Sequence, residues 1–124
     1  MDSENERSLS AENSSPAMLA AEDSNSRQAL ESLTPLEATL LRYRWRFWAR
    51  PSQRAPEWDW GIWLLMTGRG FGKTRAGAQW VIEQAQTPGN RIAIVGRIPA
   101  DGRDVMVGGE SGILSNSPPD FLPE

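Results

Sequence analysis

A glycine-rich turn between two regular patterns constrains the fold of this chain more than any other feature. Residues 68–72 read Gly-Arg-Gly-Phe-Gly. The apolar run before this turn, residues 61–66, predicts a short buried strand, and residues 74–86 after it have helical periodicity. The stretch 91–96 contains a second apolar run, residues 92–95, which is typical of a strand covered on both faces of a parallel sheet. The pattern therefore predicts an α/β fold containing one right-handed βαβ unit.

The turn has the composition and position of a phosphate-binding loop. Glycines let backbone N–H groups point toward phosphate oxygens, and the following helix presents its positive end to the same anion. Lys73 is predicted to reach the β- and γ-phosphates of ATP, and the Thr74 hydroxyl to ligate Mg²⁺. The general pattern places a glycine where this chain has Thr67, so the match is a variant. The predicted cofactor-binding residues are Gly68, Arg69, Gly70, Phe71, Gly72, Lys73 and Thr74.

Two features of the loop leave alternatives open. A glycine turn that merely connects strand to helix explains the glycines, but it leaves the Lys73–Thr74 pair unexplained. Arg69 adds a second cation beside the expected γ-phosphate, which suggests a catalytic role in hydrolysis. The alternative is that Arg69 points to solvent or pairs with a carboxylate.

Composition divides the chain into two parts. Residues 1–32 hold seven acidic and two basic residues and no aromatic residue, and they are predicted to be a disordered acidic leader. Order is expected from Leu33, because Thr34-Pro35-Leu36-Glu37 has the pattern of a helix N-terminus with a capping box. One helix is predicted from there to Pro51, with a basic stripe formed by Arg42, Arg46 and Arg50. That stripe is interpreted either as a solvated face or as a contact for DNA phosphates or for adenosine.

The chain contains no cysteine and no histidine, which excludes zinc sites, thiol nucleophiles and Ser-His-Asp catalysis within it. No apolar run is long enough to cross a bilayer, and no secretory signal pattern is present. A cytoplasmic protein is therefore expected.

Residues 63–78, Trp-Leu-Leu-Met-Thr-Gly-Arg-Gly-Phe-Gly-Lys-Thr-Arg-Ala-Gly-Ala, resemble the large terminase subunit of tailed bacteriophages. The likeness is closest to terminases of alphaproteobacterial prophages and gene-transfer particles, and it extends from about Tyr43 to Gly112. It implies an ATPase of the P-loop NTPase fold that packages double-stranded DNA into procapsids and carries a nuclease domain. It also implies partners, namely double-stranded DNA, the portal protein and the small terminase subunit.

A hydrolysing P-loop enzyme also needs a strand that ends in an acidic residue. Residues 92–95 are followed by Gly96-Arg97, and residues 105–107 by two glycines. Residues 33–124 are therefore predicted to be the N-terminal part of such an ATPase domain, truncated before the acidic (Walker B) strand. No appreciable hydrolysis by this chain alone is expected. The alternatives are a nonenzymatic nucleotide-binding or partner-docking remnant of a prophage gene and, less well matched, a P-loop kinase.

Overall fold

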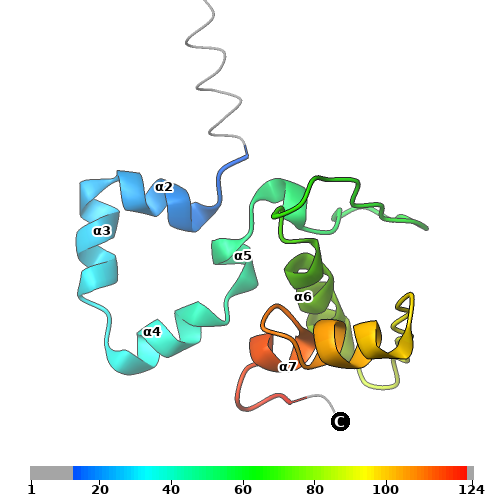
Figure 1. Ribbon diagram of the computed structural model, residues 1–124. Coiled ribbons are helices and arrows are strands. Elements are labelled where there is room, and N and C mark those ends of the chain that lie inside the picture. Colours follow the sequence, from blue (N-terminus) through cyan, green and yellow to red (C-terminus); the bar gives the residue numbers. More distant parts are fainter. Residues whose placement is uncertain (1–12, 123–124) are drawn as a thin grey trace, which may run out of the picture. The chain divides into compact units, whose positions relative to one another are not determined.

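The computed structural model describes residues 13–122, which form helices joined by turns and extended segments (Figure 1). The chain divides between Arg54 and Ala55 into two compact units. Within residues 13–122, the first unit holds four α-helices and the short 3₁₀-helix η1, and the second holds two α-helices and the π-helix η2. Their bounds are α2 (Pro16–Glu22), α3 (Ser24–Glu31), α4 (Pro35–Arg42), α5 (Trp45–Trp48), η1 (Pro51–Gln53), α6 (Lys73–Ala85), η2 (Asp101–Val107) and α7 (Ile113–Asn116).

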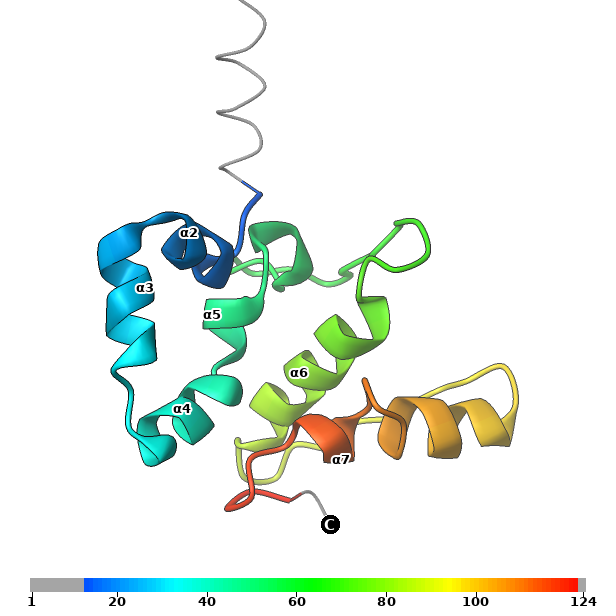
Figure 2. The same cartoon turned by 60° about the vertical axis from the view of Figure 1, so that its left-hand side comes forward.

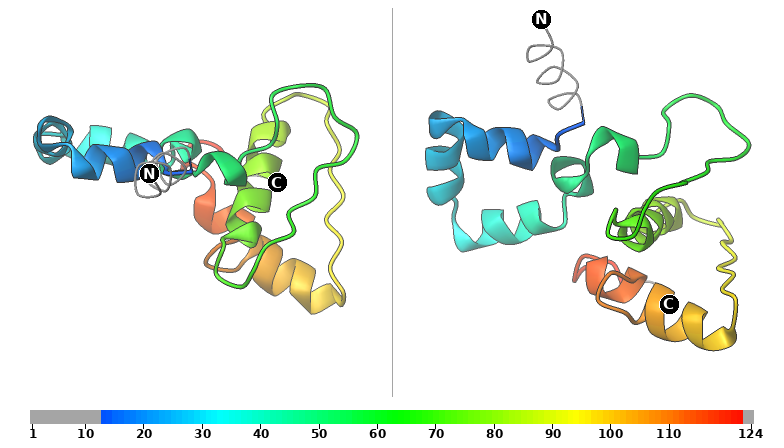
Figure 3. Two further views of the ribbon diagram at one scale, coloured as in Figure 1. Left: turned by 90° about the horizontal axis from the view of Figure 1, so that it is seen from above. Right: turned by 45° about the horizontal axis from the view of Figure 1, so that its top comes forward.

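The prediction of an α/β fold with a parallel βαβ unit is wrong. Residues 61–67 and 91–96 are extended, but no strand is formed anywhere in residues 13–122, and Figure 3 draws both segments without arrows. A strand needs a neighbouring backbone with which it exchanges N–H···O=C bonds, and no such bond joins these two described segments. One side of the first segment is also uncovered, because Ile62, Leu64 and Met66 are 88%, 70% and 81% exposed.

Two short helices lie within the stretch that the sequence assigns to a disordered leader. The Ser15 hydroxyl accepts a hydrogen bond from the Met18 N–H at 3.2 Å and caps α2. The Asp23 carboxylate accepts one from the Ser26 N–H at 2.8 Å and caps α3. These are the acceptor types preferred at helix N-termini. Residues 1–12 of the predicted leader lie outside the described residues.

The predicted helix start at Thr34 is confirmed. The Thr34 hydroxyl accepts a hydrogen bond from the Glu37 N–H at 3.3 Å, and the Thr34 N–H donates to Glu37 Oε2 at 2.8 Å. Together these two bonds make the capping box, which satisfies two backbone donors at the start of α4.

The prediction of one continuous helix to Pro51 is wrong. Helix α4 ends at Arg42, and Arg44 adopts non-helical angles (φ −79°, ψ 86°) before α5 begins (Figure 2). The Leu41 carbonyl lies in the last turn of α4. It accepts a hydrogen bond from the Trp48 indole N–H at 2.8 Å. Because the helix is broken, Arg42, Arg46 and Arg50 do not form a stripe along one helix face.

The capping box predicts a pH dependence of α4. Hydrogen bonds donated by the Thr34 side chain and then by its backbone lower the pKa of Glu37. A carboxyl whose pKa is lower in the folded state stabilises that state above its unfolded pKa, and the contribution is lost as pH falls through the folded pKa. Between pH 6 and pH 3, the wild-type chain should lose more far-UV helix signal than Glu37→Gln. Glu110→Gln, which removes an exposed acid outside the helices, should follow the wild type.

The second unit is organised around α6. Helix α6 matches the predicted residues 74–86 to within one residue, and residues 87–89, Thr-Pro-Gly, end it as expected. Its Ala78 and Ile82 pack with Ile113 of α7, and Val81, Val107 and Phe121 lie partly buried around them. The α7 turn is held by the Ser117 hydroxyl, which donates to the Ile113 carbonyl at 2.9 Å. This small cluster is the core that positions the helix behind the glycine loop.

Candidate phosphate-binding site

The glycine loop enters α6 through two left-handed backbone positions. Gly70 has a φ of 81°, and Gly72, the N-cap of α6, has a φ of 91° and a ψ of 28°. Side-chain-bearing residues rarely adopt these angles, whereas glycine adopts them without steric penalty. The sequence therefore uses glycine at the two positions where the chain reverses direction in front of the helix.

Lys73 closes this loop with its own side chain. Its Nζ donates to the Gly68 carbonyl at 2.7 Å, to the Thr67 carbonyl at 2.9 Å and to the Thr67 hydroxyl at 3.3 Å. Three oxygens at the start of the loop are thus gathered around the one ammonium at its end. The structure consequently brings Lys73 and Gly68 together.

Thr67 is a site residue that sequence reasoning did not assign. The sequence shows it only as a departure from the usual glycine, yet two of its oxygens accept hydrogen bonds from Lys73. The sequence signal for this role is the position of Thr67, six residues before Lys73. A tight glycine turn between the two residues brings them together in space.

The start of α6 adds a positive potential to the loop. The first N–H groups of a helix have no partner within it, and Gly72 supplies no side-chain cap for them. The aligned peptide dipoles also place partial positive charge at this end. Helix α6 spans 13 residues, so this end has the donors and the field that anion-binding helix termini use.

The remaining predicted residues differ in exposure. Arg69 and Thr74 are exposed, and no hydrogen bond or ion pair joins either side chain to another residue of the described chain. Phe71 is half-buried. The structure therefore leaves the Arg69 guanidinium and the Thr74 hydroxyl accessible at the surface.

Acidic side chains do not gather near the loop. Across residues 13–122, no group of three or more acidic side chains is placed so that it could hold a metal ion. One ion pair of the second unit lies elsewhere, on η2, where Arg103 Nε meets Asp104 Oδ1 at 2.6 Å and lowers the pKa of that carboxyl. The Thr74 hydroxyl, facing solvent, fits the expected role of a single protein ligand to a nucleotide-bound Mg²⁺.

Comparisons with protein-family models, with curated proteins and with solved structures give no match to this chain. Within the part of the chain that the structure describes, no helix has the length and apolar character needed to cross a membrane.

Proposed function

We propose that residues 67–74 bind the phosphates of ATP. The observation that carries this proposal is the position of Lys73 Nζ, 2.7 Å from the Gly68 carbonyl and 2.9 Å from the Thr67 carbonyl, at the N-terminus of α6. The Lys73 ammonium, the N-terminus of α6 and two glycines with positive φ thus belong to one short loop. Phosphate oxygens are the acceptors that such a set of donors suits best.

Each residue then has a defined role. The backbone N–H groups of residues 68–74 surround the β-phosphate, and Lys73 donates to the β- and γ-phosphates. The Thr74 hydroxyl contributes to Mg²⁺, which neutralises part of the triphosphate charge when it is bound. Arg69, which is exposed in the loop, is assigned to the γ-phosphate as a second cation.

For the whole protein we propose the ATP-binding part of a viral DNA-packaging motor, a large terminase subunit. The support is the resemblance of residues 63–78 to that family, including an arginine inside the loop. Double-stranded DNA, a portal protein and a small terminase subunit are the partners that this proposal implies. The second candidate is a nucleotide-binding remnant without hydrolysis, and it is favoured by Gly96-Arg97, which stand where an acidic residue would follow the apolar run.

A single reporter tests the phosphate site directly, because Lys73 is the only lysine of the chain. Labelling with ¹⁵N-lysine gives one backbone amide signal, at the first residue of α6. We expect this signal to shift in a saturable way with ATP and Mg²⁺, and with inorganic tripolyphosphate, but not with adenosine. A signal that stays in place up to millimolar ATP and tripolyphosphate would rule out the site.

A further inference from the structure

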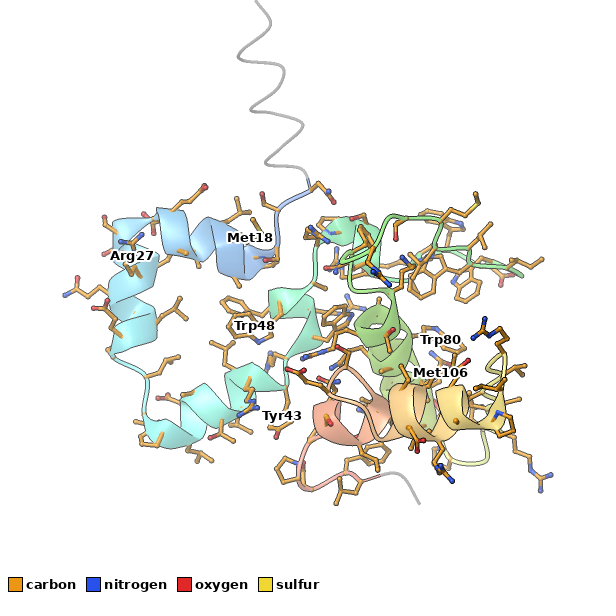
Figure 4. The ribbon with its side chains drawn as sticks, in the orientation of Figure 1. Met18, Arg27, Tyr43, Trp48, Trp80 and Met106 are labelled. Carbon is orange, nitrogen blue, oxygen red and sulfur yellow. The ribbon has the colours of Figure 1, made fainter. Side chains whose placement is uncertain are left out.

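A cavity of about 410 Å³ runs along one side of α6. Its volume falls within the range of small-molecule sites in proteins. One wall is a face of α6, the opposite wall is the extended segment of residues 92–95, and η2 and α7 each contribute one residue, Met106 and Ile113. Figure 4 shows Met106 on η2 near Trp80 on α6, and both line this cavity.

The extended wall offers backbone groups as well as side chains. Four consecutive residues, 92–95, line the cavity, and alternate side chains of an extended segment point in opposite directions. The backbone itself must therefore border the space. No hydrogen bond joins the N–H or C=O groups of these four residues to other described residues. The cavity thus combines an apolar face with a row of open donors and acceptors.

The cavity is continuous with the phosphate loop at one end. Lys73 and Thr74 belong to both its lining and the loop, and the α6 wall continues through Gly77 and Trp80 to Val81. At 1.5 Å per residue, the eight steps from Lys73 to Val81 cover roughly 12 Å. A ligand held by its phosphates at Lys73 can therefore extend along α6 with its uncharged part between the helix and residues 92–95.

From this continuity we propose that the cavity holds the purine base and ribose of the bound nucleotide. This inference rests on the proposed phosphate site and names the part of the ligand that the loop does not contact. A purine has two apolar faces and an edge of hydrogen-bonding nitrogens. Those faces suit Trp80 and the aliphatic lining, and that edge suits the open backbone of residues 92–95. The ring of Trp80 is itself supported, since its centroid lies 6.1 Å from that of Trp60.

Gly77 provides the test, because it lies in the middle of the α6 wall. A Cβ at Gly77 would meet nothing within 4 Å, so a side chain can start from this position without an immediate clash. Gly77→Leu should weaken ATP binding about tenfold or more, because it fills the space in which the base would be buried. Binding of tripolyphosphate should stay within about twofold of the wild type. Gly61→Leu is the matched control, since a Cβ there also meets nothing within 4 Å and Gly61 lies outside the cavity.

The outcomes separate this inference from the proposal on which it rests. If the wild type binds neither ATP nor tripolyphosphate, both are overturned. If tripolyphosphate binds and Gly77→Leu retains wild-type affinity for ATP, the cavity assignment is overturned and the phosphate site stands. A second measurement covers a Gly77→Leu protein that fails to fold. In the ATP-saturated wild type, nuclear Overhauser effects should connect the purine protons to methyl groups of Ile92, Ile94 or Val81, and their absence would overturn the assignment.

Discussion

Lys73→Ala is expected to lower the affinity for ATP by roughly 10- to 150-fold, which is the range for losing hydrogen bonds to a charged group. The substitution removes the only ammonium that the structure places inside the loop. Isothermal titration calorimetry with ATP and with tripolyphosphate measures the change, and both ligands should lose affinity to a similar degree.

Arg91→Ala is the control for a general effect of charge. Arg91 is exposed, lies in the same unit and carries the same charge, but it belongs to neither the loop nor the cavity. It should change the affinity for ATP by less than about twofold at physiological ionic strength, where separated surface charges are screened. Equal losses of ATP affinity in Lys73→Ala and Arg91→Ala would show that ATP binding depends only on net charge. That result would contradict a specific loop site.

Ile82→Ala is expected to destabilise the second unit by about 2–5 kcal/mol, the usual cost of truncating a buried isoleucine. Ile82 is 4% exposed and packs with Ala78 and Ile113 in the small cluster that joins α6 to α7. A core of this size has few other contacts to compensate for the loss. The midpoint of urea unfolding, followed by far-UV circular dichroism, should fall accordingly.

Ile62→Ala provides the matched comparison for that effect. It removes the same atoms from the same unit, but the Ile62 side chain is 88% exposed. Surface substitutions of this kind usually change stability by no more than about 0.5 kcal/mol. Equal destabilisation by the two variants would mean that Ile62 is covered in solution and that the described cluster is not the main core.

Local signals predicted the start of α4 and the limits of α6, but not α2, α3 or the break between α4 and α5. Both features follow from interactions between residues three or four positions apart, which can be recognised from the spacing of residues in the sequence. They are the capping box at Thr34 and Glu37 and the limits of α6. The turn in front of α6 also follows from the sequence, because glycine is the residue that tolerates the angles of Gly70 and Gly72.

Features that depend on distant partners were not predictable in the same way. The apolar runs at residues 61–66 and 91–96 have the composition of strands, but a sheet also requires backbones aligned with each other, and composition does not fix that alignment. The break of the helix at Tyr43 is stabilised by the Trp48 indole, seven residues beyond the carbonyl it binds. The cavity beside α6 likewise depends on how residues 92–95 return to the helix.

The hydrogen bonds from Lys73 to Thr67 and Gly68 give phosphate binding the character of an exchange reaction. The ammonium is already satisfied by three oxygens of its own chain, so an arriving phosphate must displace an intramolecular competitor. The measured affinity is then the difference between two sets of hydrogen bonds, and the displaced carbonyls of Thr67 and Gly68 return to water. The same competitor holds the side chain near the place where the phosphate binds, which reduces the rotamer entropy that binding must remove.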